Sequence, residues 1–182
     1  MQFIPTEIPD VVIIEPRVFE DARGYFFESW REDEFINHVS NVHFIQENES
    51  KSTRGVLRGL HFQAGNNAQA KLVRVVKGSV IDVAVDCRRS SKTFGRHVAV
   101  ELSGDNHRQL FIPRGFAHGF ITMSDEAVFT YKVDNYYAPQ TEQTILWNDK
   151  TIAVEWPQMD IPLIFASKDL QGKPFLEVDL FE

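Results

Sequence analysis

The sequence predicts a mostly β fold, and three observations lead to this prediction. Between Lys71 and about Tyr137 the chain alternates or runs β-branched, as in Leu72-Val73-Arg74-Val75-Val76. Turn signals such as Ser103-Gly104-Asp105-Asn106 separate these runs at short, regular intervals. Aromatic residues make up 12% of the chain, with 15 Phe, and such side chains suit sheet faces. We therefore expect a β-sandwich or barrel.

The expected elements follow from the same patterns. Lys77-Gly78-Ser79 reads as a turn joining strands 72–76 and 80–85 into a hairpin, and further strands are expected at 97–102, 108–112, 119–123 and 127–133. A helix is expected over 31–39, where Phe35, Ile36 and Val39 share one face. A short helical turn N-capped by Ser167 is the second helix candidate.

Length and charge restrict the class of protein. A chain of 182 residues with 43% hydrophobic content can bury one sizeable core, so we expect a single domain over residues 1–182. The formal net charge of −7 argues against binding to nucleic acid or to an anionic membrane surface, although a local basic cluster could still bind a small anion. No stretch approaches the roughly 20 apolar residues that span a bilayer.

Two further features concern the compartment. The single cysteine, Cys87, cannot form an intrachain disulfide and follows an alternating strand, so we expect a buried thiol rather than a nucleophile. The start of the sequence lacks the charged-then-apolar pattern of an export signal, and we expect a cytoplasmic protein.

The densest chemical signal is the run from Gly55 to Gln63. Side chains on one face of a strand recur at every second position, so Arg58 and His61 share a face only if the strand begins or bulges near Gly59. Glycine makes such a bulge plausible. Taken alone, a histidine in a strand is more often a structural residue than a base.

A second signal, Pro113-Arg114-Gly115-Phe116-Ala117-His118, is the second signature of the cupin barrels, which usually bind a metal through a His-x-His pair. Here His61 is followed two residues later by Gln63, and the later basic residue is Lys71, which has no lone pair for a metal while protonated. We therefore expect neither a metal nor another cofactor.

A barrel that keeps two histidines at its mouth but lacks the metal ligands needs another way to stabilise negative charge, and Lys71 can supply it. At ~4 Å and an effective dielectric near 20, its ammonium would stabilise an oxyanion by roughly 4 kcal/mol. With His61 as a base and Tyr131 as a candidate acid, these residues could remove and return a proton beside a carbonyl.

The chain resembles the dTDP-4-dehydrorhamnose 3,5-epimerases over nearly its whole length. The matching runs, in order, are 21–28, 46–48, 55–63, 71–73, 91–95, 112–120, 131–132 and 147–149. The resemblance implies a metal-independent cupin-type jelly roll with a few short helices, usually a homodimer, that inverts C3 and C5 of dTDP-4-dehydro-6-deoxyglucose. The extended N-terminal segment could exchange between subunits.

The same resemblance implies a role for each matching residue. His61 would be the base, oriented by Asp169; Lys71 would hold the enolate oxygen; and Tyr131 would return the proton on the opposite face. Tyr137 would stack on the thymine. The nucleotide sugar would be bound by Arg23, Glu28, Gln46, Asn48, Arg58, His118, Glu142 and Lys168.

Alternatives stay open at this point. Tyr136 or Tyr137 could compete with Tyr131 for the acid role, and Glu142 and Lys168 could be solvated surface charges. Three other functions are alternatives to the 3,5-epimerase: a single-carbon epimerase or 3,4-ketoisomerase of another deoxysugar, a metal-dependent cupin oxygenase, and a sugar-binding cupin without catalysis.

Overall fold

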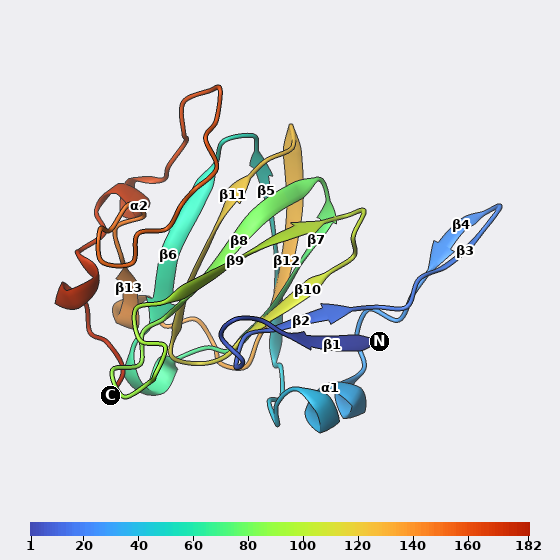
Figure 1. The fold of residues 1–182 in the computed structure, drawn as a ribbon, viewed down its shortest axis with the longest axis horizontal. Coiled ribbons are helices and arrows are strands. Elements are labelled where there is room, and N and C mark those ends of the chain that lie inside the picture. The colour runs from blue at the N-terminus through green and yellow to red at the C-terminus, as the bar shows by residue number, and fades with distance from the viewer.

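Two antiparallel sheets face each other in the computed structural model, which describes residues 1–182 (Figure 1). The six-stranded sheet has the order β1 (Gln2–Pro5), β2 (Val12–Glu15), β10 (Gln109–Ile112), β7 (Lys71–Lys77), β12 (Glu126–Val133) and β5 (Gln46–Thr53). The five-stranded sheet has the order β13 (Glu142–Thr144), β6 (Leu57–Gln63), β11 (Phe116–Thr122), β8 (Ser79–Asp86) and β9 (His97–Ser103). The mostly β sandwich expected from the sequence is confirmed.

Two short helices and three 3₁₀ turns complete the fold. Helix α1 spans Glu32–His38, as expected, and α2 spans Ser167–Leu170. The 3₁₀ turns lie at Gly65–Asn67, Pro139–Thr141 and Phe175–Glu177. No helix has the length and apolar character needed to cross a membrane.

The core lies between the two sheets. One apolar cluster of 15 buried residues joins them and includes Val73 and Val75 from β7 together with Val80 and Ala84 from β8. Phe129 stacks on Phe120 across the interface, with ring centroids 4.4 Å apart. The interdigitation of these inner faces holds the sandwich together and leaves its polar cleft at one side of the core.

The predicted hairpin of β7 and β8 is wrong. The two strands are consecutive in sequence, but β7 pairs with β10 and β12, whereas β8 pairs with β9 and β11 in the other sheet. The chain crosses between sheets at Gly78, whose φ is +78°. Both strands contribute apolar residues to the one core between the sheets, and the crossing places these residues on its two sides.

The predicted N-cap of α2 is also wrong. Ala166, not Ser167, occupies the cap position. Its backbone N–H donates to Oδ2 of Asp169 at 2.9 Å, so the carboxylate of the helix satisfies this donor and no serine cap is needed. Cys87, in contrast, is fully buried as expected, and burial raises its pKa to about 12.

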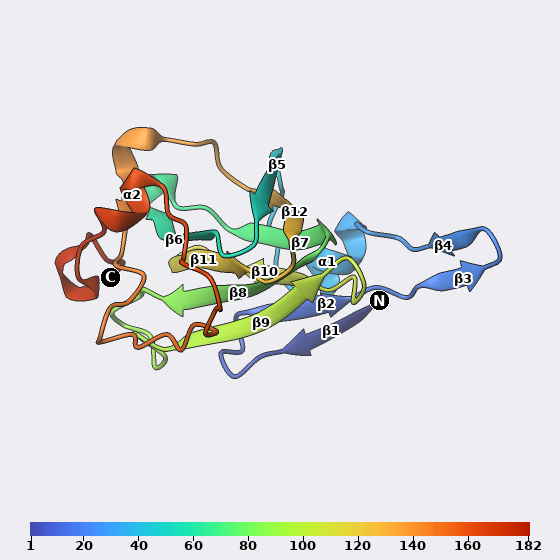
Figure 2. The same ribbon diagram turned by 90° about the horizontal axis from the view of Figure 1, so that it is seen from above.

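A hairpin arm projects from the sandwich. It consists of β3 (Phe19–Asp21) and β4 (Gly24–Phe26), which pair only with each other. Figures 1 and 2 show the arm extending away from the two sheets in both views. Tyr25 and Phe26 are 60% and 70% exposed, so the arm carries aromatic surface that this chain does not cover.

The crossover at Gly78 predicts a specific sensitivity. A Cβ at this position would lie 2.0 Å from the carbonyl oxygen of Glu126, in addition to the strain of a positive φ. Gly78→Ala should therefore lower the free energy of unfolding by several kcal/mol, measured by urea denaturation. Gly65→Ala is the matched control, because Gly65 also has a positive φ (+60°) but open space around it, and should cost about 1–2 kcal/mol. Equal losses in the two variants would contradict this account.

Candidate active site

A cleft opens between the two sheets beside α2. Strands β5, β7 and β12 supply one wall, β6, β11 and β13 supply the other, and α2 contributes the last residues. Its lining is Ser50, Arg58, His61, Phe62, Gln63, Gln69, Lys71, His118, Phe120, Phe129, Tyr131, Tyr137, Glu142, Ala166, Lys168 and Asp169. Nine residues singled out in the sequence thus meet in one place: Arg58, His61, Lys71, His118, Tyr131, Tyr137, Glu142, Lys168 and Asp169.

A bulge in β6 turns its functional side chains to the same side. His118 pairs with His61 and Phe120 pairs with Arg58, so two steps along β11 span three along β6. The extra residue falls at Gly59, where a Cβ would lie 2.6 Å from the facing β11 backbone. The bulge predicted near Gly59 is confirmed, and it brings Arg58 and His61 into the same cleft.

His61 is supported by a buried carboxylate. Its Nε2 lies 2.8 Å from Oδ1 of Asp169, whose side chain is only 2% exposed. The contact is at ion-pair distance but is not a well-aligned hydrogen bond. Asp169 is fixed in turn by backbone N–H groups, since Gly59 donates to Oδ1 at 3.3 Å and Ala166 donates to Oδ2 at 2.9 Å. The imidazole therefore contacts an anion held rigidly from two sides.

The environment keeps Asp169 ionised. Burial acts to raise the pKa of this carboxyl, but the contact with His61 and the N–H groups of Ala166 and Gly59 outweigh burial. Its pKa consequently lies below the usual 3.8. Asp169 is an anion at neutral pH and can stabilise a positive charge that develops on His61.

Lys71 begins β7 on the opposite wall from His61. Burial lowers the pKa of its ammonium to about 8, while the negative charges of Asp82 and Glu142 act in the other direction. A group with this pKa is mostly cationic at neutral pH, yet it is poorly solvated. Such a cation is well suited to stabilise an oxyanion formed in the cleft.

A second histidine and aspartate lie beside the first pair. His118 is the direct cross-strand partner of His61, and its Nε2 lies 2.8 Å from Oδ2 of Asp82 on β8. Burial lowers the pKa of His118, and the attraction of Asp82 only partly offsets this. His118 is therefore neutral near pH 7 and acts in the cleft as a hydrogen-bonding group.

Tyr131 projects from β12 toward the same space. Burial raises the pKa of its hydroxyl, although Lys168, Arg58 and a hydrogen bond with Asn48 act against burial. Asn48 faces Tyr131 across the β5 and β12 pairing, and its Oδ1 accepts a hydrogen bond from Nε2 of Gln46 at 2.8 Å. Gln46 and Asn48 thus lie next to Tyr131 on the edge strand, although neither lines the cleft itself.

Three further residues form a network at the mouth of the cleft. Nζ of Lys168 lies 2.9 Å from Oε1 of Glu142, and the hydroxyl of Tyr137 donates to Oε2 of the same carboxylate at 3.2 Å. Burial acts to raise the pKa of Glu142, but Lys168 outweighs it and the pKa falls below its usual range. Tyr137 is 55% exposed, and its ring can stack on a flat ligand.

Arg23 and Glu28 do not reach this cleft. Arg23 lies in the turn of the hairpin arm, 90% exposed at its side chain and paired with Asp21 at 2.5 Å. Glu28 follows the arm directly, and neither residue is part of the lining. The arm points away from the two sheets (Figure 2).

The structure adds lining residues that sequence reasoning missed. Gln63 and Gln69 hold the neighbouring loop, since Nε2 of Gln63 donates to the carbonyl of Asn67 at 2.7 Å and Nε2 of Gln69 donates to that of Asn135 at 2.7 Å. Asp82, behind His118, was also missed. It could have been found from the sequence, because Asp82 is the only charged residue in the apolar run Val80-Ile81-Asp82-Val83-Ala84.

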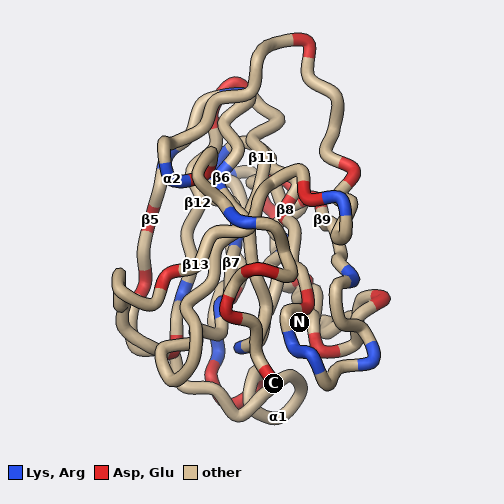
Figure 3. The backbone as a smooth tube through the Cα atoms, turned by 90° about the vertical axis from the view of Figure 1, so that its left-hand side faces the viewer, with Lys and Arg blue, Asp and Glu red and all other residues tan.

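The charges of the site are mixed in sign. Figure 3 shows Lys and Arg positions (blue) beside Asp and Glu positions (red) in the region of α2 and β6. No group of three or more His, Cys, Asp or Glu side chains in the structure is arranged to hold a metal ion. The cleft presents a carboxylate-supported imidazole, a poorly solvated ammonium and a half-buried phenol around one space.

Comparison with known proteins identifies the family. The model of the dTDP-4-dehydrorhamnose 3,5-epimerase family matches residues 5–177. The chain belongs to this family. The resemblance noted from the sequence is thereby confirmed, and the chain is a member of a family of carbohydrate epimerases.

Individual relatives agree over the whole chain. The dTDP-4-dehydrorhamnose 3,5-epimerase of Shigella flexneri is 55% identical over 182 residues, covering 100% of this chain and 99% of that protein. A crystal structure of a dTDP-6-deoxy-D-glucose-3,5-epimerase from Legionella pneumophila, in complex with dTDP-4-keto-L-rhamnose, is 43% identical with a TM-score of 0.94 and covers 98% of this chain and 94% of that one.

A more distant neighbour has a narrower activity. A 3'-monoepimerase from Streptomyces bikiniensis, in complex with dTDP-quinovose, is 29% identical with a TM-score of 0.88, covering 95% of this chain and 87% of that one. The same fold therefore serves both double and single epimerisation.

Proposed function

We propose that this chain is a dTDP-4-dehydro-6-deoxyglucose 3,5-epimerase that forms dTDP-4-dehydro-L-rhamnose. The observation that carries the proposal is the placement of His61, with Asp169 at 2.8 Å, in the same cleft as Lys71 and Tyr131. Relatives with this activity in their names, at up to about half identity over the full chain, support the choice of substrate.

The cleft geometry suits inversion of a carbon beside a ketone. His61 comes from the five-stranded sheet and Tyr131 from the six-stranded sheet, so a sugar bound between them has one residue on each face. His61 takes the proton from C5 or C3, the electron pair moves to the C4 oxygen, and Tyr131 gives a proton to the same carbon from the other side. Solvent then returns a proton to Tyr131 and accepts one from His61.

Lys71 stabilises the enolate in this scheme. An ammonium at ~4 Å from the C4 oxygen, at an effective dielectric near 20, contributes roughly 4 kcal/mol. Because burial has already lowered its pKa to about 8, the charge of Lys71 is weakly solvated and free to interact with the developing oxyanion.

The remaining cleft residues fit a nucleotide diphosphate sugar. Arg58 and Lys168 supply cations for the diphosphate, and the exposed ring of Tyr137 supplies a stacking surface for thymine. We assign sugar contacts to His118 and Glu142, and contacts at the rim to Gln46 and Asn48.

We infer a homodimer from the position of the arm. The family resemblance implies binding roles for Arg23 and Glu28, but the arm points away from the two sheets and neither residue lines the cleft of its own chain. We infer that the arm reaches the cleft of a second copy and that its exposed aromatic residues, including Tyr25 and Phe26, are covered there. Each site would then combine a sandwich from one subunit with an arm from the other. We also keep the cytoplasm as the proposed compartment.

Isotope exchange tests the proposed reaction. Incubation of the protein with dTDP-4-dehydro-6-deoxyglucose in deuterated water should introduce deuterium at both C3 and C5, detected by NMR and mass spectrometry. His61→Ala should lose exchange at both carbons while retaining affinity for dTDP, because the base is gone and the nucleotide contacts lie elsewhere.

The position of the deuterium also distinguishes a 3,5-epimerase from the second candidate function, a single-carbon epimerase. Deuterium at C3 alone would identify a single-carbon epimerase, an outcome that the fold shared with the Streptomyces bikiniensis 3'-monoepimerase makes worth measuring. Absence of label at either carbon would overturn the proposed function, and wild-type exchange in His61→Ala would overturn the role of His61.

Complementation tests the shared site. Arg23→Ala and His61→Ala should each be weak or inactive alone, yet mixing them after unfolding and refolding should restore about a quarter of wild-type activity. Half of the randomly mixed dimers would be heterodimers, each with one intact site, because Arg23 of one chain joins His61 of the other. If activity does not recover although heterodimers form, the arm does not complete the partner's cleft.

A further inference from the structure

Asp82 is a buried carboxylate with no assigned role in the reaction. It lies in the middle of β8 on the same face as Val80 and Ala84, which belong to the core between the sheets, and its exposure is 0%. Placing an ionised carboxylate in such surroundings costs several kcal/mol unless charges or hydrogen bonds compensate. Neighbouring groups must therefore balance the charge of Asp82.

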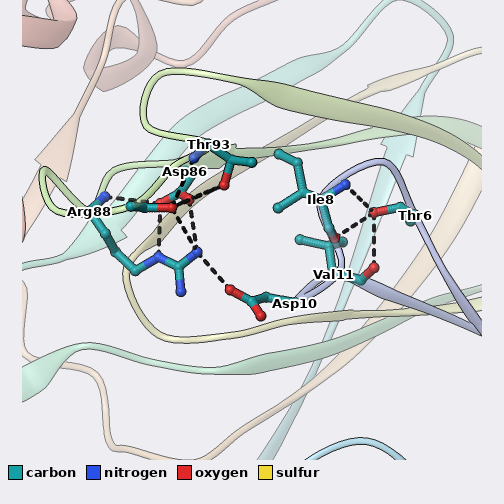
Figure 4. Close-up of polar contacts among 8 residues, drawn as sticks. Thr6, Ile8, Asp10, Val11, Asp86, Arg88 and Thr93 are labelled. Atoms are coloured by element: carbon teal, nitrogen blue, oxygen red, sulfur yellow. Dashed lines mark hydrogen bonds and ion pairs between the residues drawn. The ribbon is translucent and has the colours of Figure 1, made fainter.

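The polar contacts of Asp82 are incomplete. Oδ2 lies 2.8 Å from Nε2 of His118, but Oδ1 is buried without a hydrogen-bond partner. Asp86, four residues further along the same strand and also 0% exposed, shows the usual solution. Its carboxylate accepts hydrogen bonds from Arg88 and Thr93 (Figure 4) and from Ser91. Asp82 has no arginine, so its charge must be balanced by the cleft.

The other anions of the cleft already have close partners. Asp169 contacts His61 and two backbone N–H groups, and Glu142 contacts Lys168 and Tyr137. Lys71 has no ion pair within 4.0 Å. The titratable and charged groups around it are Asp82 on β8, His118 on β11, Arg58 and His61 on β6, Tyr131 on β12, Tyr137 in the loop before β13, Glu142 on β13, and Lys168 and Asp169 on α2.

We propose that Asp82 is a positioning residue that acts through two neighbours. It fixes the proton of His118 on Nε2, and it is the buried counter-charge that keeps the ammonium of Lys71 protonated where the enolate oxygen forms. This inference rests on the proposed epimerase function, since it assigns Lys71 to the enolate.

The first consequence concerns His118. An Nε2–H that donates to Asp82 leaves Nδ1 with a lone pair, and burial keeps the ring neutral by lowering its pKa. His118 therefore accepts a hydrogen bond in the cleft and favours a hydroxyl group of the sugar over a second acceptor.

The second consequence concerns pH. Burial is the main cause that lowers the pKa of Lys71 to about 8, and Asp82 is the strongest charge acting against burial. Activity requires the cation, which is present below this pKa and lost as pH rises through it. The wild-type profile of kcat/KM should therefore fall above about pH 8, and loss of the Asp82 charge should move that fall to lower pH.

Asp82→Asn tests the proposal, because the amide oxygen can still accept from His118 while the charge is gone. We expect the alkaline limb of kcat/KM to move down by about one pH unit and kcat at pH 8 to fall about fivefold, with KM changed far less. Titration of ¹³C-methylated lysines by NMR, with Lys71 assigned through Lys71→Arg, should show the same shift without substrate. Asp86→Asn is the matched control and should lower stability but leave the limb in place.

Two results would overturn the proposal. One is a Lys71 titration and an alkaline limb in Asp82→Asn that equal those of the wild type. The other result can be obtained even if Asp82→Asn does not fold. The guanidinium of Lys71→Arg cannot lose its proton in this pH range. An alkaline limb of kcat/KM that persists near pH 8 in Lys71→Arg would therefore show that a group other than Lys71 sets the limb. If Asp82→Asn shifts the titration of Lys71 but the wild-type protein does not epimerise the substrate, the result contradicts the proposed function instead.

Discussion

The contact between His61 and Asp169 is the interaction on which the site depends. It joins β6 to a four-residue helix more than a hundred residues later, and the same carboxylate holds the backbone at Gly59 and Ala166. One buried side chain therefore fixes the bulge of β6, docks α2 against the sheet and orients the imidazole. Burial of Asp169 is tolerated because its two oxygens accept hydrogen bonds from the backbone and contact His61. These contacts offset the desolvation of the carboxylate and hold the base in a fixed orientation.

The rest of the cleft follows the same principle of balanced buried charge. Lys168 and Tyr137 compensate Glu142 at the mouth, whereas Lys71 is left without a close ion pair. An ammonium that was already neutralised by a tight salt bridge would gain little from an enolate. A partly compensated one gains more, and this explains why its strongest counter-charge, Asp82, lies deeper in the sandwich behind His118.

Sequence patterns predicted the class of the fold and the set of His61, Lys71 and Tyr131, and the family resemblance supplied the other residues of the site. The strands between residues 71 and 133 have strong β-branched periodicity, and the bulge near Gly59 followed from requiring Arg58 and His61 on one face. The pairing of strands was not predictable in the same way. A turn such as Lys77-Gly78-Ser79 indicates a change of direction but not whether the next strand stays in the sheet or crosses to the other one, which depends on the core that both strands share.

The missed features have related causes. The cap of α2 depends on Asp169, whose main partner lies on a distant strand, so local rules favoured Ser167 instead. Asp82 looked like an ordinary alternation within a strand because its importance comes from His118 across the sheet. Arg23 and Glu28 were found by resemblance, but their distance from the cleft of the same chain could be seen only once the arm was placed.

A crystal structure of the protein with dTDP-D-glucose, a substrate analogue that lacks the ketone, tests the central claim most directly. The account predicts that the sugar ring lies between the sheets, with an imidazole nitrogen of His61 facing C3 and C5 on one side, the Tyr131 hydroxyl on the other, and Nζ of Lys71 at hydrogen-bond distance from O4. A sugar bound outside this space, or with His61 and Tyr131 on the same face of the ring, would contradict it.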